Sequence, residues 1–384
     1  MSLFSTMKEK FGAQPNRSLS EALVKEALAT VIDPDLHKDI VSLGFVRNIE
    51  IKGDTVSLEV NLTTPACPVK EQLKAECEAE VRKLPGVATV NVVMTATTSA
   101  PKAASAVASP ALAGVKNIIA VASGKGGVGK STTAVNIAFA LARAGSKVGL
   151  LDADVYGPSI PRMVAITTPA GEGKVGGATV IVPPQADGIK VLSAGMFASA
   201  NEAMILRGPM AGGVIKQLLT QVEWGELDYL VIDYPPGTGD IQLTISQTAP
   251  VTGAIIVTTP QEISLIDVRK AISMFKTLKV PVLGVIETMS YFICDGCDKK
   301  HFIFRQGGGE RLAREFGVAY LGGVPLDPAV AVSSDEGRAQ VVAHPDSAVA
   351  RAYVTAAGAA AQQLSILNAN AGDTMSQFSL VWQH

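Results

Sequence analysis

The sequence predicts an α/β protein in which a doubly wound, mostly parallel sheet follows a small α+β domain. Three observations support this prediction. Apolar runs rich in Val, Ile and Leu alternate with helical patterns along most of the chain, which is typical of parallel strands covered on both faces. A glycine-rich stretch joins one of these runs to a helical pattern. A segment of small residues and prolines, 99–114, separates this region from a shorter one before it.

The composition is that of a folded protein without a nucleic-acid surface. The chain has 384 residues, of which 47% are hydrophobic and 18% charged, and its net charge is −2. Neutrality and an aromatic content of 5% argue against nucleic-acid partners. The start shows no signal-peptide pattern, and no apolar run is long enough to span a membrane. We therefore expect a cytoplasmic protein without a membrane partner, whose four cysteines are thiols.

Four segments are expected. They are a small α+β domain over 1–98, a flexible linker over 99–114, a larger α/β domain over 115–367 and a C-terminal tail over 368–384.

The small domain should follow the order α-β-β-α-β. A helical pattern covers 19–32, and two strand-like runs follow with a turn at 52–54. The next helix should place Val69, Leu73, Cys77 and Val81 on one face, and a last strand, ATVNVVMTA, closes the domain.

The glycine-rich stretch reads GKGGVGKST and lies between the apolar run IIAVAS and a helical pattern. It matches G-x-x-x-x-G-K-[ST] in its required context, so the larger domain is predicted to be a P-loop NTPase domain that hydrolyses ATP slowly. Lys130 should reach the outer phosphates, and Ser131 should offer its hydroxyl to Mg²⁺. The residues predicted to surround the phosphates are Gly124, Lys125, Gly126, Gly127, Val128, Gly129, Lys130, Ser131 and Thr132.

Carboxylates follow two predicted strands. Asp152 and Asp154 come after KVGLL, whereas Asp233 comes after LDYLV and Asp240 lies beyond a glycine-rich turn. Carboxylates at strand ends suit Mg²⁺ and the orientation of an attacking water. We count Asp152 and Asp240 with the nucleotide-binding residues.

The loop carries a second lysine, Lys125, directly after its first glycine. In this the loop resembles the deviant Walker A class of ATPases. The resemblance implies that Lys125 reaches the nucleotide of a partner subunit in a face-to-face homodimer. It also implies that Asp154 positions the attacking water, that Asp233 is the Walker B carboxylate and that Asp240 acts as a switch.

Cys294 and Cys297 lie in the stretch YFICDGCDKKHFIF and leave several interpretations open. A thioredoxin-like redox pair would stand near the first strand of a small fold. A zinc site needs four ligands, and His301 supplies only a third. Two buried structural thiols would not suit so polar a stretch. If two subunits face each other, four thiolates meet, which is the number that a 4Fe–4S cluster takes.

Several further stretches together resemble the Mrp/ApbC family of iron–sulfur cluster carrier ATPases. They are DADVYGPSIPRM, ILRGPM, DYPPGTGD, VTTPQEISLIDVRKAI, SYFICDGCDKKHFIF and GGGERLA. In the first region, DPDLHKDIVSLGFV and TTPACPVKEQL are similar to the SufT-like domain of iron–sulfur assembly proteins.

The resemblance implies a homodimer that binds a 4Fe–4S cluster through Cys294 and Cys297. It implies transfer of this cluster to apo-proteins, contacts with assembly scaffolds, and ATP as the modulator of transfer. Cys67 matches the cysteine of the SufT-like motif and is a candidate accessory thiol. Four residues depart from the family pattern: Thr288 replaces an Asn expected at the adenine edge, Tyr234 replaces a Leu, and Asp295-Gly296 replaces Pro-His.

Three other functions remain open at this point. A positioning ATPase of the ParA/MinD kind would bind DNA or membrane through a basic face or an amphipathic tail. An ATP-driven electron donor resembling the nitrogenase iron protein would share the dimer and the cluster. A scaffold would show no ATP turnover.

Overall fold

The computed structural model describes residues 19–101, 109–197 and 208–380, and it contains two units. Within the described residues, the smaller unit comprises the chain up to Leu62 together with Val69–Ala96. The larger unit comprises Thr63–Pro68 and the residues from Thr97 onward. The expected linker thus falls partly outside the described residues, at 102–108. Three other predicted segments also lie partly outside the described residues. They are the chain start, residues 205–207 of the ILRGPM motif and the last four residues of the expected tail.

The smaller unit has the predicted α-β-β-α-β order. Its sheet has the order β1-β2-β3, in which β1 and β2 are antiparallel and β2 and β3 are parallel. The second helix buries Leu73, Cys77 and Val81, as its periodicity predicts. The elements are α1 Glu21–Leu28, β1 Val46–Lys52, β2 Thr55–Leu62, α2 Lys70–Arg82 and β3 Thr89–Ala96.

The first helix is shorter than predicted. The apolar pattern suggested a helix up to residue 32, but α1 ends at Leu28. Val31 instead accepts a backbone hydrogen bond from Ile40, and Ile32 forms a bridge with Asp39. Burial of Val31 is therefore achieved in a turn, which the sequence pattern does not distinguish from a continuing helix.

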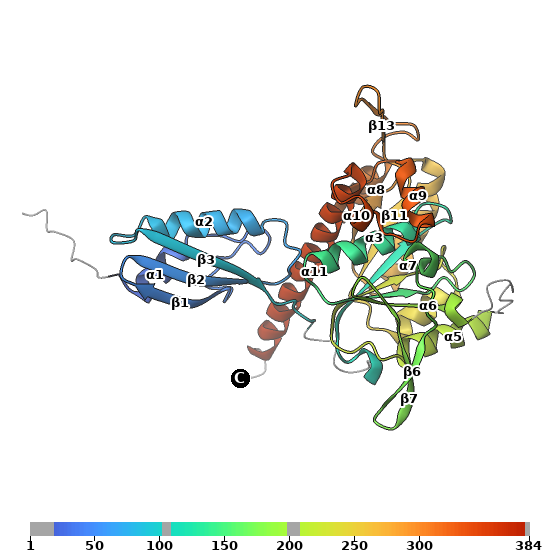
Figure 1. The fold of residues 1–384 in the computed structure, drawn as a ribbon, viewed down its shortest axis with the longest axis horizontal. Coiled ribbons are helices and arrows are strands. Elements are labelled where there is room, and N and C mark those ends of the chain that lie inside the picture. The colour runs from blue at the N-terminus through green and yellow to red at the C-terminus, as the bar shows by residue number, and fades with distance from the viewer. Residues whose placement is uncertain (1–18, 102–108, 198–207, 381–384) are drawn as a thin grey trace, which may run out of the picture. The chain divides into compact units, whose positions relative to one another are not determined.

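The larger unit contains an eight-stranded sheet of order β15-β12-β11-β4-β10-β5-β9-β8. Figure 1 shows the unit with β11 labelled. All neighbouring strands are parallel except β8 and β9, which form a hairpin. The strands are β4 Val115–Ser123, β5 Val148–Asp152, β8 Gln185–Ala186, β9 Ile189–Ser193, β10 Leu227–Asp233, β11 Gly253–Thr258, β12 Val282–Glu287 and β15 Tyr320–Gly323.

Helices cover both faces of this sheet, which confirms the predicted doubly wound fold. On one face Ile119 and Val121 of β4 pack with α3 and α11; on the other, Ile118 and Ala120 pack with α5, α6 and α7. The helices are α3 Lys130–Arg143, α4 Ile160–Met163, α5 Gly208–Thr220, α6 Asp240–Thr248, α7 Glu262–Thr277, α8 Gly308–Phe316, α9 Pro328–Asp335, α10 Gln340–Ala343 and α11 Ala348–Leu380.

Two hairpins extend from the sheet region and were not predicted as strands. The first, β6 Gly171–Val175 with β7 Ala178–Val182, precedes β8. The second, β13 Phe292–Ile293 with β14 Lys300–His301, carries the paired cysteines and is seen at the top of Figure 1. Among the described helices, none is long and apolar enough to cross a membrane.

The strand order brings together the segments that carry the predicted chemistry. Strand β10 lies between β4 and β5, and Asp233 at its end pairs in register with Asp152 of β5. The chain leaves β4 at Ser123 and enters the glycine-rich loop at the same edge of the sheet. The carboxyl ends of these three strands therefore form one site.

Candidate nucleotide site and cysteine hairpin

The glycine-rich loop connects β4 to α3, in the strand–loop–helix context that the sequence predicts. Gly127 and Gly129 have φ angles of 78° and 80°, a left-handed conformation that favours glycine. At Gly124 a Cβ atom would lie 2.3 Å from the backbone carbon of Asp267, so only glycine fits there. The loop leads directly into the N-terminus of α3, where backbone N–H groups bind anions.

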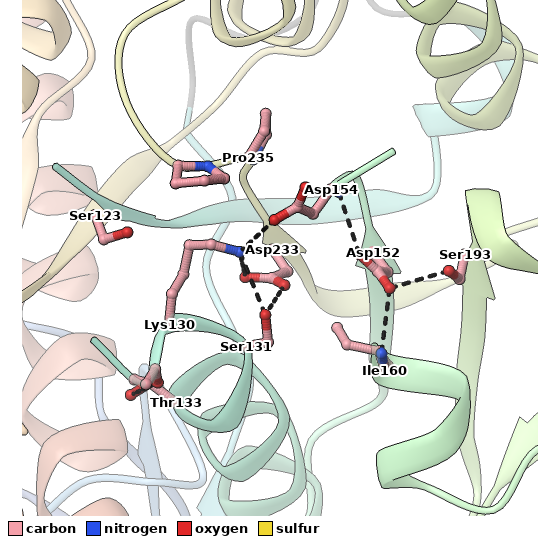
Figure 2. A network of polar contacts seen from close by, with 12 residues as sticks. Ser123, Lys130, Ser131, Thr133, Asp152, Asp154, Ile160, Ser193, Asp233 and Pro235 are labelled. Atoms are coloured by element: carbon pink, nitrogen blue, oxygen red, sulfur yellow. Dashed lines mark hydrogen bonds and ion pairs between the residues drawn. The ribbon is translucent and has the colours of Figure 1, made fainter. Parts of the chain in front are cut away.

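Lys130, Ser131 and Asp233 form the centre of this site, as Figure 2 shows. The Lys130 Nζ lies 2.6 Å from an Asp233 carboxylate oxygen, and the Ser131 hydroxyl donates to the other oxygen at 2.6 Å. Asp233 is fully buried and the Lys130 side chain is 7% exposed. A buried charge is stable only when it is paired and hydrogen-bonded, and this arrangement satisfies both conditions.

Two further aspartates lie beside this centre. Asp154 is half-buried, and its carboxylate is 3.6 Å from the Lys130 Nζ. Asp152 is fully buried and accepts hydrogen bonds from the Ser193 hydroxyl at 3.0 Å and from the Ile160 backbone at 3.2 Å. Burial, and then the charge of Asp233, raise the pKa of Asp152 to about 7. Its two hydrogen bonds thus connect β5, which contains Asp152, to Ser193 of β9 and to Ile160 of α4.

The other predicted nucleotide residues lie at the rim. Lys125 is exposed, and its backbone carbonyl accepts a hydrogen bond from the Ser123 hydroxyl at 2.9 Å. Asp240 is also exposed and is the first residue of α6. The structure therefore brings Lys130, Ser131 and the strand-end aspartates together but leaves Lys125 and Asp240 facing solvent.

Thr288 contacts the phosphate loop directly, which the sequence did not indicate. Its buried hydroxyl lies 2.7 Å from the Val128 carbonyl oxygen and 3.0 Å from that of Thr258. The sequence placed this residue at the adenine edge by resemblance alone. A three-dimensional contact between positions 128 and 288 leaves no local pattern in the sequence.

The cysteine hairpin presents its thiols to solvent. Cys297 is exposed and Cys294 is half-buried. A tight turn holds them near each other, because the backbone N–H of Asp298 donates to the Cys294 carbonyl at 2.8 Å. The backbone N–H of Gly296, and then the Cys297 side chain, lower the pKa of Cys294 and so favour its thiolate.

The described residues contain no group of three or more His, Cys, Asp and Glu side chains placed to hold a metal ion. The hairpin supplies two thiols from one chain.

The remaining two cysteines differ in their surroundings. Cys77 is fully buried, and burial raises the pKa of its thiol to about 12, so the predicted core role is confirmed. Cys67 is half-buried in the Thr63–Pro68 segment of the larger unit, three residues before α2 begins. In this segment Thr64 shares a buried hydrogen bond of 3.0 Å with the Tyr229 hydroxyl.

Residues 114–361 match the model of a protein family described as NUBPL iron-transfer P-loop NTPase. The chain belongs to this family. Residues 21–92 match a second model, described as iron-sulfur cluster assembly protein.

Curated relatives agree with both matches. The chain is 45% identical to an iron-sulfur cluster carrier protein of Deinococcus radiodurans, over 91% of this chain and 96% of that protein. It is 41% identical to an iron-sulfur cluster carrier protein of Escherichia coli, over 93% of this chain and 96% of that protein. Among solved structures, a nucleotide-binding protein from Archaeoglobus fulgidus in complex with ADP is 40% identical. Its TM-score is 0.53, and the match covers 60% of this chain and 89% of that one.

The site has the donor set that a P-loop NTPase needs for magnesium. Mg²⁺ prefers oxygen ligands, and the Ser131 hydroxyl and the Asp233 carboxylate lie 2.6 Å apart beside the start of α3.

The residue after Asp233 is Tyr234, where the family pattern has a Leu. Tyr234 turns into the core on the other face of the sheet, where its hydroxyl is 3.3 Å from that of Ser246 and its ring packs against Phe275.

Proposed function

We propose that this chain is an ATP-hydrolysing iron–sulfur cluster carrier that works as a homodimer and transfers a 4Fe–4S cluster to apo-proteins. One observation carries the proposal: the same unit combines a glycine-rich loop, with the buried Lys130–Asp233 pair beside it, and an exposed two-thiol hairpin. The family and the curated relatives support it, because the family is described as an iron-transfer P-loop NTPase and the relatives as iron-sulfur cluster carrier proteins. Assembly scaffolds are the expected source of the cluster.

The nucleotide chemistry is assigned to the loop and to the strand ends. The loop residues 124–132 bind the phosphates of ATP through backbone N–H groups, and Lys130 neutralises the outer phosphates. Ser131 and Asp233 hold Mg²⁺, which offsets the phosphate charge when it is bound. With nucleotide bound, Lys130 would exchange its contact with Asp233 for one with phosphate, and the Asp233 carboxylate would then be available, with the Ser131 hydroxyl, to hold Mg²⁺.

Hydrolysis is assigned to Lys125, Lys130, Asp154 and Asp233. Asp154 orients a water for attack on the γ-phosphorus, and the bond to the bridging oxygen of ADP breaks. Lys125, which is exposed, reaches the nucleotide of the partner subunit and neutralises charge there. Asp240, at the start of α6, responds to the loss of the γ-phosphate. Asp152 is kept among the nucleotide-binding residues, and its hydrogen bonds also hold β5, β9 and α4 together.

The cluster site is assigned to Cys294 and Cys297 of both subunits. A 4Fe–4S cluster takes four thiolates, so each chain supplies half of the set. Exposure of the hairpin suits transfer, because an incoming thiolate of an apo-protein needs access to the iron. Cys67 is assigned an accessory role in transient contact with the cluster or a partner.

We also retain the proposed organisation of the chain. It comprises a SufT-like domain over 1–98, a linker over 99–114, the ATPase and carrier domain over 115–367 and a tail over 368–384. The helix α11 continues across the last of these boundaries.

The deciding experiment is anaerobic reconstitution with iron and sulfide. About four iron and four sulfide per dimer are expected for the wild type, with the charge-transfer absorption of a 4Fe–4S cluster. The Cys294→Ala/Cys297→Ala variant should lose both, whereas the matched variant Cys67→Ala should keep them. Iron that survives loss of the cysteine pair would contradict the proposal.

A further inference from the structure

The segment that carries the cysteine hairpin is fastened at both ends by one buried carboxyl group. Glu287, the last residue of β12, is fully buried. The Ser290 hydroxyl donates to one of its oxygens at 2.6 Å, and the Gly309 backbone N–H donates to the other at 2.6 Å. Ser290 precedes the hairpin and Gly309 follows it in α8. The two ends of the intervening segment 291–308 therefore meet at Glu287.

Backbone hydrogen bonds complete this attachment. The Ser290 N–H donates to the Val324 carbonyl at 3.0 Å, and the Val324 N–H donates to the Glu287 carbonyl at 2.8 Å. The Leu326 N–H donates to the Tyr291 carbonyl at 2.7 Å. The base of the hairpin is thus fixed to the chain that leaves β15, while its tip with the cysteines faces solvent.

Glu287 has no basic partner among the residues that the structure describes, since its contacts are a hydroxyl and a backbone N–H. A buried carboxyl group without a cation destabilises a fold relative to an apolar residue of similar size. Its carboxyl group holds both ends of segment 291–308, which explains why an acidic residue is buried at this position.

The next residue contacts the phosphate loop. The Thr288 hydroxyl donates to the Val128 carbonyl at 2.7 Å. The Thr288 methyl group also lies close to Gly129, since a Cβ atom added there would be 3.6 Å from it. Glu287 and Thr288 share one planar peptide, so a shift of Thr288 also moves Glu287. A continuous chain of contacts therefore runs from Val128 to the base of the cysteine hairpin.

We propose that Glu287 and Thr288 are positioning residues that couple the phosphate loop to the cysteine hairpin. Nucleotide that binds the loop changes the position of the Val128 carbonyl, and this pair transmits the change to the hairpin. Binding at either site then alters the other, because coupling between two sites is reciprocal. The inference rests on the proposed function only in treating the hairpin as the cargo site.

The test measures the reactivity of the cysteines in the metal-free, full-length chain. The rate of alkylation of Cys294 and Cys297 by iodoacetamide is determined by peptide mass spectrometry. It is measured without nucleotide and with magnesium and a slowly hydrolysed ATP analogue, at concentrations that saturate each variant. For the wild type, nucleotide should change the rate by about fivefold, a moderate coupling.

Two variants interrupt the chain of contacts at different points. Thr288→Val removes the hydroxyl but keeps the shape, and Glu287→Gln replaces an acceptor with an amide that also carries donors. In both, the ratio of rates with and without nucleotide should fall to about one. In Glu287→Gln the rate without nucleotide should also rise, because the hairpin is released at its base.

Thr133→Val is the matched control. The Thr133 hydroxyl donates to the Gly129 carbonyl at 2.8 Å, so this variant also removes a hydroxyl from a loop carbonyl, but on α3 and away from the hairpin. It should keep the wild-type ratio.

Two results would overturn the coupling. One is an alkylation rate in the wild type that nucleotide does not change. The other is a ratio of rates in Thr288→Val or Glu287→Gln that equals the ratio measured for the wild type. If Thr288→Val loses nucleotide binding, Glu287→Gln decides alone. Because the assay uses metal-free protein, it is independent of the reconstitution experiment. If the protein binds no cluster but nucleotide still changes the alkylation rate, the proposed function is refuted and this inference stands. If the protein binds the cluster but nucleotide does not change the alkylation rate, only this inference is refuted.

Discussion

The nucleotide site and the cysteine hairpin belong to the same unit but are built in opposite ways. Lys130 and Asp233 are buried at the ends of central strands, where each charged group is held by several protein contacts. Cys297 is exposed, on a hairpin whose strands are two residues long. The charges of the nucleotide site require a fixed, dry environment, because electrostatic interactions are stronger there than in water. The thiols require access, because their proposed cargo leaves with another protein.

This difference predicts where substitutions affect stability. Substitutions in the nucleotide site should affect both folding and nucleotide binding, whereas substitutions at the hairpin tip should leave the stability of the fold nearly unchanged. The following experiments test that separation.

The largest effect is expected for Lys130→Ala. Loss of the ammonium group removes the main charge that contacts phosphate and should weaken ATP binding by about 100-fold or more. The reconstituted iron content per chain should stay unchanged, because the hairpin does not contact Lys130. Equilibrium binding of a fluorescent ATP analogue and iron analysis on the same sample check both statements. Unchanged ATP affinity would refute the role of the phosphate loop, and loss of iron would show that cluster binding itself requires Lys130.

Asp152→Asn should change the pH dependence of stability. The pKa of Asp152 is raised from 3.8 to about 7, so the folded state binds a proton that the unfolded state has released. The stability contributed by this proton is complete below the unfolded-state pKa and is lost as the pH rises through the folded-state pKa. The melting temperature of the wild type should therefore fall relative to that of the variant between pH 5 and pH 8, which corresponds to about 2 kcal/mol.

Thermal unfolding in the absence of Mg²⁺ and nucleotide measures this difference. Asp240→Asn, which changes an exposed carboxylate at the same edge of the sheet, should follow the wild-type trend. Parallel curves for the wild type and Asp152→Asn would show that burial does not hold this proton.

Lys125→Ala tests an exposed lysine beside the buried pair of Lys130 and Asp233. If Lys125 acts across a dimer, its loss should lower ATP turnover by about tenfold, a typical value for one charged contact in a transition state. ATP affinity should change by less than about twofold, because Lys125 is exposed and is assigned to the nucleotide of the partner subunit rather than to that of its own chain. Turnover and affinity are measured with sedimentation velocity to follow the dimer. Lys174→Ala, on the β6–β7 hairpin, is the control for an exposed lysine.

The smallest effect is expected for Cys297→Ser when stability is measured. An exposed side chain makes few contacts, so the free energy of unfolding should change by less than about 0.5 kcal/mol. The same substitution at Cys77 places a hydroxyl in the core and should cost about 2 kcal/mol. Denaturant unfolding of both variants gives the comparison. A large loss of stability in Cys297→Ser would mean that the hairpin tip is part of the core structure.

Local patterns were sufficient to predict most of the large sheet. The apolar run IIAVAS lies within β4, and the glycine-rich loop lies between β4 and α3 as expected. Apolar periodicity and the conformational demands of glycine act over a few residues, so they are readable without a structure. The same reasoning failed at α1, where Val31 is buried by a turn rather than a helix.

The sequence by itself determined the residue types that carry the chemistry: a phosphate loop, aspartates after strands and a cysteine pair in a polar stretch. Only the tertiary structure decided which of them meet. Asp152 and Asp233 become neighbours through the register of β5 and β10, and Gly309 reaches Glu287 across the whole cysteine segment. Thr288 contacts Val128 although 160 positions separate them. Such contacts depend on strand order and on the path of the chain between elements, and the physical forces that fix them act on the packed fold rather than on any local stretch of sequence.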